Sequence, residues 1–130
     1  NLSTSIWEQP FNMKKYISFA KFSETYYEGM VANPHDRKEA IYKLFDAANM
    51  KIVSEDTIFY TEHPDFDFVC VAWADNEETC KALQAMMVAT GKVKKVLFTR
   101  AWSSQDWQEI SKKASSLVGT YVAPSDAKKD

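Results

Sequence analysis

The feature that most constrains this chain is a nearly continuous run of apolar residues from Phe66 to Trp73. A strand with one face in water alternates apolar and polar residues, whereas a strand covered on both faces is apolar almost throughout. The polar residues 62–65, with Pro64 among them, mark a turn directly before the run. The run therefore predicts a central strand of a sheet that other elements must cover.

Residue patterns before this strand predict, in order, a strand, a loop, a helix and an irregular strand. Residues 16–22 are aromatic or apolar on both alternating sets, as in a covered strand, and residues 23–33 connect them to a helix. That helix begins after Asn33 and Pro34. Its apolar face comprises Ile41, Leu44, Phe45 and Ala48. Residues 51–61 then predict a strand with a bulge near its middle, where acidic residues fall.

Patterns after the apolar run predict a helix, a strand and a further helix. Residues 75–78 cap the first of these helices, which ends at Gly91, and residues 92–102 form the strand. Ser103 and Asp106 resemble a capping box that opens the last helix. Its apolar face comprises Trp107, Ile110, Ala114 and Leu117. The resulting order is the ferredoxin-like α+β arrangement, βαββαβ, with a four-stranded antiparallel sheet and an added C-terminal helix.

Length and composition indicate one ordinary globular domain. The chain has 130 residues, of which 45% are hydrophobic and 26% charged, with 3 Gly and 4 Pro. This composition supports a real core and excludes fibrous and low-complexity classes. We assign residues 13–122 to the domain, residues 1–12 to an N-terminal extension or a remnant of cloning, and residues 123–130 to a flexible polar tail.

Charge and cysteine content limit the setting and the partners. Sixteen Lys and Arg nearly balance 18 Asp and Glu, for a net charge of −2, so we expect neither a nucleic-acid nor a membrane partner. Two cysteines are too few for a disulfide framework or a thiolate zinc site, which favours the cytoplasm. The sequence also lacks a secretory-signal pattern and any apolar run of about 18 residues.

The predicted arrangement leaves one sheet face without cover, because both long helices lie on the other face. Aromatic residues make up 14% of the chain, and a face of large apolar side chains is too large a patch to remain in water on a monomer. We therefore expect either closure by the last helix or pairing with a second copy, and we predict a homodimer.

Residues 57–107 resemble the GYD-domain family, which consists of small proteins of the dimeric α/β-barrel type. The similar motifs are Asp65-Phe66-Asp67 at the position of Gly-Tyr-Asp, Gly91-Lys92-Val93 before the last strand, Lys21-Phe22, and Pro34-x-x-Arg37. Within the triplet only Asp67 is shared, and the similarity extends over roughly residues 14–114. The resemblance implies the fold and a homodimer but no particular chemistry, since the family's biochemical role is largely unassigned.

Three residues are candidates for catalysis: Asp67, His63 and Arg100. Asp67 starts an otherwise apolar strand, where a carboxylate needs solvent, backbone donors or a cation, and we expect Arg100 to be its partner. In the structural interpretation, which we favour, Asp67 fixes the turn. In the catalytic interpretation, Asp67 or His63 acts as a base and Arg100 stabilises an anion.

The acidic turn also contains a set of metal-ligand types. These residues are Glu62, His63, Asp65 and Asp67. An extended segment would place His63, Asp65 and Asp67 on one side, but Pro64 favours a turn over that geometry. We therefore expect no metal site.

Seven aromatic side chains are candidates for lining a pocket for a small apolar ligand: Tyr16, Phe19, Tyr60, Phe68, Trp73, Phe98 and Trp102. Tyr60, His63 and Arg100 would supply its polar contacts. Core and dimer packing explain the same aromatic residues without a ligand, and we favour that explanation.

Two functions remain open. The first, which we favour, is a non-catalytic ligand-binding or assembly module. The second is a cofactor-independent enzyme, similar to a monooxygenase or an isomerase, that acts on a small apolar or aromatic metabolite. The sequence has no Gly-rich phosphate loop and no nucleophile elbow, and we expect no cofactor.

An RNA-recognition module is a weaker alternative with the same strand order. Residues 66–71 are similar to part of the aromatic motif on its third strand. However, Pro64 and Asp65 replace the basic and glycine residues of that motif, and the Asp67 carboxylate would repel phosphate. We therefore do not expect RNA binding.

Overall fold

The apolar run forms the strand β4, which lies inside the sheet between two other strand positions. The computed structural model describes residues 9–10 and 12–128. Its strands are β1 (Lys14–Phe22), β2 (Lys51–Ile52), β3 (Phe59–Tyr60), β4 (Phe68–Ala74) and β5 (Val93–Arg100). Its α-helices are α1 (Glu24–Ala32), α2 (Lys38–Ala47), α3 (Glu77–Ala89) and α4 (Ser104–Ser116), and two short 3-10 helices span Glu55–Thr57 and Pro124–Asp126.

The sheet is antiparallel throughout, with the order β2-β4-β1-β5 and with β3 also paired to β4. The register places Ser18 of β1 opposite Cys70 of β4 on one side and opposite Phe98 of β5 on the other. The predicted α+β class and the antiparallel sheet are thus confirmed, and the arrangement is compatible with a ferredoxin-like fold.

The irregular strand predicted for residues 51–61 is present as two short strands. β2 and β3 pair with opposite ends of β4, and the 3-10 helix Glu55–Thr57 separates them. The backbone N–H of Val53 still donates to the carbonyl of Val71 at 2.9 Å. The interruption is confirmed, but the prediction of one continuous strand and of a four-stranded sheet is wrong in this detail.

The loop predicted for residues 23–33 is wrong, because this segment forms the helix α1. None of its residues is buried, so its apolar side chains do not show the spacing of a covered helical face. The helix is held to the sheet mainly by aromatic contact, with the rings of Tyr26 and Phe22 stacked at 3.7 Å. Sequence periodicity could not detect a helix that buries no stripe.

The predicted start of the next helix is also wrong. The backbone N–H of Asn33 donates to the carbonyl of Gly29 at 3.0 Å, so Asn33 caps the end of α1. The helix α2 begins only at Lys38, whose N–H donates to Oδ1 of Asp36 at 2.8 Å. The later caps are confirmed: Asn76 accepts from the N–H of Thr79 at 2.9 Å, and α4 opens with a capping box.

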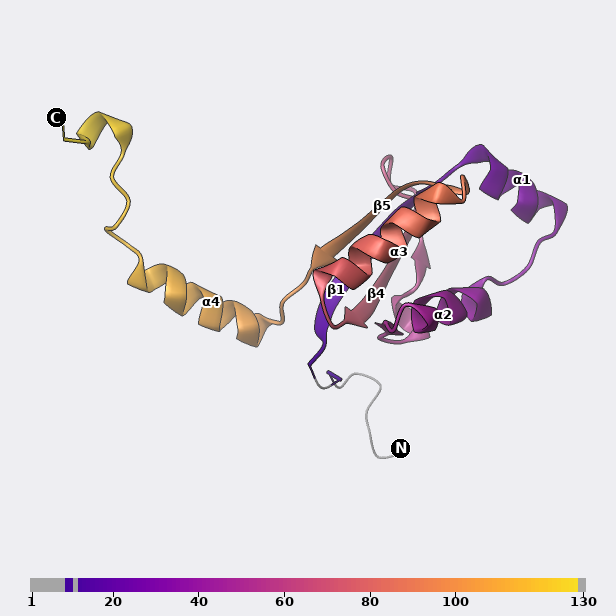
Figure 1. The fold of residues 1–130 in the computed structure, drawn as a ribbon, viewed down its shortest axis with the longest axis horizontal. Coiled ribbons are helices and arrows are strands. Elements are labelled where there is room, and N and C mark those ends of the chain that lie inside the picture. Colours follow the sequence, from indigo (N-terminus) through magenta and orange to yellow (C-terminus); the bar gives the residue numbers. More distant parts are fainter. Residues whose placement is uncertain (1–8, 11, 129–130) are drawn as a thin grey trace.

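The main core lies between the sheet and the helices α2 and α3 (Figure 1). Along β1, alternate residues are buried toward these helices: Tyr16, Ser18, Ala20 and Phe22. The intervening residues lie on the opposite face, which no helix of the described residues covers (Figure 1). That face has a smaller cluster of its own, formed by Met13, Val53 and Trp73.

The helix α4 extends away from the sheet and does not close the uncovered face (Figure 1). Its apolar residues are therefore left in solvent, with Trp107 59% and Leu117 62% exposed. Of the two ways in which we expected the open sheet face to be covered, closure by the last helix is absent from the described part of the chain.

The described residues include only part of the predicted N-terminal extension and of the predicted tail. Most of the predicted extension 1–12 lies outside the described residues. Within it, the Gln9 side chain donates to the carbonyl of Met13, and the N–H of Met13 donates to the carbonyl of Pro10 at 3.1 Å. No helix within the described ranges has the length and apolarity needed to cross a membrane.

Candidate functional site

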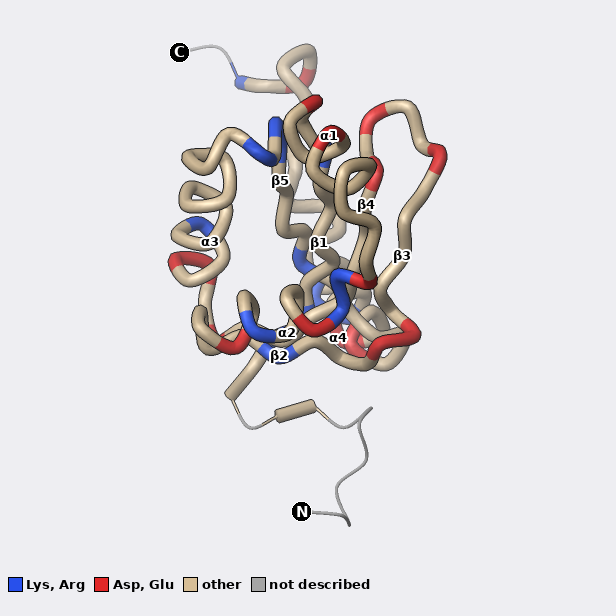
Figure 2. The backbone as a smooth tube through the Cα atoms, turned by 90° about the vertical axis from the view of Figure 1, so that its right-hand side faces the viewer, with Lys and Arg blue, Asp and Glu red and all other residues tan. Residues whose placement is uncertain are grey.

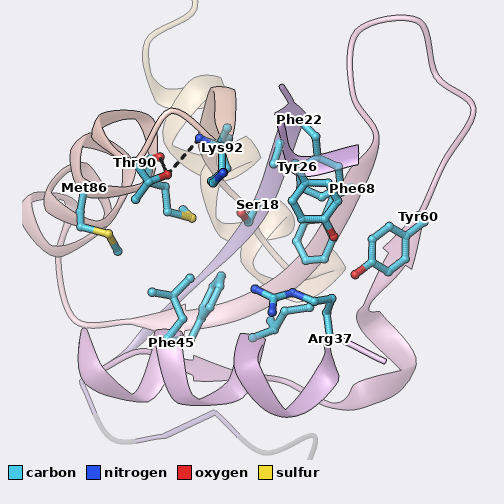
Figure 3. A pocket seen from close by; sticks show the side chains of 15 residues that line it. Ser18, Phe22, Tyr26, Arg37, Phe45, Tyr60, Phe68, Met86, Thr90 and Lys92 are labelled. Atoms are coloured by element: carbon cyan, nitrogen blue, oxygen red, sulfur yellow. Dashed lines mark hydrogen bonds between the residues drawn. The ribbon is translucent and has the colours of Figure 1, made fainter. Parts of the chain in front are cut away.

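A cavity of about 250 Å³ lies between the buried sheet face and the helices (Figure 3). Its floor is formed by Ser18 and Ala20, two small residues at the middle of β1. Large side chains surround this floor: Phe22, Phe45, Phe68, Met86, Met87 and Val93. Because small residues lie beneath large ones that reach over them from α2, α3 and the strand ends, the packing leaves a space at the centre.

Apart from the Ser18 hydroxyl at the floor, the polar groups that we consider for a ligand lie around the rim of the cavity. Arg37 at the start of α2 and Tyr60 on β3 reach toward the cavity from one side, and Lys92, just before β5, lies on the other side (Figure 3). Tyr26 on α1 presents its ring next to Phe22. The site thus combines an apolar interior with hydroxyl and cationic groups at its edge, which is the usual composition of a small-molecule site.

The Tyr60 hydroxyl is held in its neutral form. Burial raises the pKa of Tyr60 above its ordinary value, and a hydrogen bond with Tyr26 raises it further, whereas the charge of Arg37 lowers it. At neutral pH the Tyr60 hydroxyl is therefore protonated and can donate a hydrogen bond.

Arg37 is half-buried and has few partners. Its Nη1 lies 3.3 Å from Nε2 of His35, and none of the ion pairs among the described residues includes it. The neighbouring carboxylates are engaged elsewhere, since Asp36 accepts from the N–H of Lys38 and Glu55 pairs with Lys38 Nζ at 2.7 Å. The guanidinium therefore remains a free positive charge at the edge of an apolar cavity.

Asp67 lies outside this cavity and ties β1 to the start of β4. Its carboxylate accepts from the backbone N–H of Phe22 at 2.9 Å and from Nζ of Lys21 at 3.3 Å. Burial raises the pKa of the Asp67 carboxyl, but these two hydrogen bonds and one from Tyr27 outweigh burial and lower the pKa below its ordinary value. The carboxylate is thus ionised and saturated with donors, which suits a structural brace better than a base.

Arg100 is not the partner of Asp67, contrary to the prediction. It pairs with Tyr16 at the start of β1, whereas Asp67 contacts Phe22 at the end of the same strand, and these positions are about 20 Å apart along an extended chain. The guanidinium donates to the carbonyl of Lys15 at 3.3 Å and lies 5.1 Å from the ring centroid of Trp102. Lys21 takes the role that we expected of Arg100.

His63 lies on the exposed loop between β3 and β4, where Figure 2 shows a concentration of acidic residues. Its Nδ1 accepts from the N–H of Asp65 at 3.1 Å, and its ring lies 5.8 Å from that of Phe66. The candidates His63, Asp67 and Arg100 therefore do not share one site. Within residues 9–10 and 12–128, no group of three His, Cys, Asp or Glu side chains could hold a metal ion.

The seven aromatic candidates divide among four places. Only Tyr60 and Phe68 line the cavity. Tyr16 and Phe98 line a second hollow beside α3, among charged side chains such as Glu77 and Lys81. The remaining three lie elsewhere: Phe19 and Trp73 on the uncovered sheet face and Trp102 beyond the end of β5.

Most residues that line the cavity were not predicted as site residues from the sequence. Of the polar contacts that we predicted for a ligand, Tyr60 lines the cavity, while His63 and Arg100 do not. Arg37 went unnoticed as a site residue because it was expected inside a helix. One signal was available in residues 16–22. The residues of this strand that face the helices are large at both ends, Tyr16 and Phe22, and small in the middle, Ser18 and Ala20.

The two cysteines are free and buried. Burial raises the pKa of Cys70 to about 12 and that of Cys80 to about 11. Both thiols are therefore protonated at neutral pH and are poor nucleophiles, so neither supplies a reactive group to a site.

No protein-family model, no curated protein and no solved structure matches the chain. The resemblance to the GYD-domain family stays a prediction from the motifs that suggested it.

Proposed function

We propose that the protein is a non-catalytic binding module that holds a small, mainly apolar molecule in the cavity between the sheet and the helices α2 and α3. The observation that carries this proposal is the cavity itself, about 250 Å³ with a largely apolar lining. An apolar cavity of about 150 Å³ in another protein is enough to bind benzene. A ring with a short side chain matches the available space.

Binding is favoured over catalysis because the groups that could move a proton are in the wrong places. Asp67 is saturated with donors outside the cavity, and His63 is on an exposed loop. The titratable groups at the cavity are Tyr26, Tyr60, Arg37 and Lys92, and the raised pKa of Tyr60 makes it a poor base at neutral pH. A cofactor-independent enzyme would need a base near its substrate.

Filling the cavity is expected to abolish binding. Ala20 is buried at the cavity floor, and Ala20→Leu places three more carbons in the space that the ligand would occupy. We expect hydrocinnamyl alcohol, a phenyl ring with a three-carbon alcohol, to bind the unmodified chain, and its affinity for the variant to fall by about tenfold or more. Native mass spectrometry detects the complex, and calorimetric titration measures the affinity of the alcohol for the unmodified chain and for the variant.

The matched control is Ala32→Leu, the same substitution at an exposed position near the end of α1. It is expected to leave binding unchanged. Equal affinities of the unmodified chain and a folded Ala20→Leu for the alcohol would contradict the proposed function, as would the failure of the alcohol and of its charged analogues to bind the unmodified chain.

We further propose that the protein is a homodimer of the dimeric α/β-barrel type, paired through the uncovered sheet face. The supporting observation is the apolar surface of that face. Leu97 of β5 is 38% exposed there, and Phe59 at the edge is also exposed. Ile17, Phe19 and Val69 of the inner strands lie between them, half-buried. A contiguous apolar patch of this kind on a folded chain is typical of an interaction surface.

A charge on this face is expected to separate the two copies. Leu97→Glu would bury an unpaired carboxylate at the interface, so light scattering coupled to size exclusion should show a monomer where the unmodified chain is a dimer. Leu117→Glu introduces the same charge directly after α4 and should leave the dimer intact. A monomeric unmodified chain, or dissociation by Leu117→Glu alone, would rule out pairing through the sheet.

A further inference from the structure

We propose that the ligand of the cavity is an amphipathic carboxylate, an apolar body with one anionic group that binds Arg37. This inference rests on the proposed function and adds to it the chemical class of the ligand. It depends on where charge lies around the cavity and on which of those charges are already neutralised.

Arg37 carries a positive charge that no carboxylate of the described residues neutralises. Its guanidinium extends over the cavity (Figure 3), and within the described residues its one side-chain hydrogen-bond partner is His35 at 3.3 Å. A half-buried arginine beside apolar side chains loses hydration that an anion can replace. The planar guanidinium offers paired N–H donors that match the two oxygens of a carboxylate.

The charged side chains that line the cavity are both positive. The other ionisable cation at the cavity is Lys92, on the opposite rim, and no carboxylate is among the residues that line this space. Asp36 and Glu55, the acidic residues near Arg37, line a neighbouring hollow, where Glu55 is paired with Lys38 and Asp36 accepts from the N–H of Lys38. The cavity therefore favours an anion over a cation or a neutral molecule.

The apolar interior of the cavity limits the ligand to one anionic group beside Arg37. Away from Arg37 and Lys92, the interior is formed by Ala20, Phe22, Phe45, Phe68 and Met87, which cannot accommodate a second charge. Tyr60 adds one protonated hydroxyl close to Arg37, and rotation of its O–H away from Tyr26 lets it donate to the same carboxylate. An apolar body with a single carboxylate at one end satisfies Arg37, Tyr60 and the apolar interior together, while the exposed Lys92 on the opposite rim stays in water.

The test compares three probes with one carbon skeleton: hydrocinnamate, hydrocinnamyl alcohol and phenylpropylamine. Each is titrated calorimetrically into the full chain at neutral pH, where the carboxylate and the amine are charged. We expect hydrocinnamate to bind about tenfold or more tightly than the alcohol, since hydrogen bonds to charged groups are the stronger ones. The amine is expected to bind weakest.

Variants assign the preference to Arg37. Arg37→Gln should reduce the affinity for hydrocinnamate by far more than that for the alcohol and so abolish the preference, while Arg37→Lys should keep part of it. The matched control is Arg100→Gln, which removes the other arginine of the chain, far from the cavity, and should leave the preference unchanged. Thermal unfolding of each variant verifies that it is folded.

The outcomes separate this inference from the proposed function. If the alcohol binds at least as tightly as hydrocinnamate, the cavity binds ligands but the carboxylate is wrong. If Arg37→Gln, folded, weakens both probes equally, Arg37 shapes the cavity without recognising an anion, and the inference is again wrong. If none of the three probes binds, the proposed function fails as well.

Discussion

Phe45→Ala is expected to lower the free energy of unfolding by about 3–5 kcal/mol, the largest stability change that we predict. Phe45 is 2% exposed and is the one fully covered residue of α2. Its ring meets that of Phe98 edge-on at 6.4 Å, which ties α2 to β5 across the core. Truncation removes these contacts and enlarges a cavity that is already present.

Chemical denaturation followed by circular dichroism measures this change. The control is Trp107→Ala, truncation of an aromatic ring on α4 that is 59% exposed and lies outside the proposed interface, and it should cost less than half as much. Equal losses for the two variants would mean that α2 does not pack on the sheet as described.

Asp67→Ala is expected to lower the free energy of unfolding by about 1–3 kcal/mol. The Asp67 side chain is 15% exposed, and its loss leaves the backbone N–H of Phe22 without its carboxylate partner. The ion pair with Lys21 contributes less, because the lysine is partly solvated. The effect on stability is thus expected even though Asp67 does not line the cavity.

The same carboxylate makes stability depend on pH. The folded-state pKa of Asp67 lies below the ordinary value of 3.8, because hydrogen bonds from Phe22, Lys21 and Tyr27 outweigh the effect of burial. A group of this kind contributes stability above its unfolded pKa, and the contribution is lost as the pH falls through the folded pKa. Unfolding measured from neutral pH to below pH about 3 should show this loss in the unmodified chain and a smaller loss in Asp67→Asn.

Asp65→Asn serves as the control for the acid titration. Asp65 lies on the exposed loop two positions away, so the variant should follow the unmodified chain. If Asp67→Asn and Asp65→Asn give the same pH profile, the brace between β1 and β4 is not formed in solution.

Features that depend on local sequence were predictable. The apolar run indicated an inner strand because cover on two faces leaves no place for polar side chains, and β4 lies inside the sheet. The caps at Asn76 and Ser103 were predictable because each side chain accepts from a backbone N–H only three residues further along the chain.

Features that depend on register or on long-range packing were not predictable. The pairing of Asp67 with Arg100 fails because β1 separates them, with Arg100 opposite its start and Asp67 beside its end. The cavity was missed because its residues come from seven elements and the segments between them, and only the fold brings Phe45 above Ser18. The helix α1 was missed because it buries no stripe.

The most direct test of the account is to map where a ligand binds, by following the backbone amide resonances of the labelled full chain during titration with hydrocinnamyl alcohol. We predict the largest shifts at Ser18, Ala20, Phe45 and Phe68, which surround the cavity from β1, α2 and β4. Shifts confined to the uncovered sheet face around Phe19 and Leu97, or to the hollow at Glu77, would contradict the assignment of this cavity as the binding site.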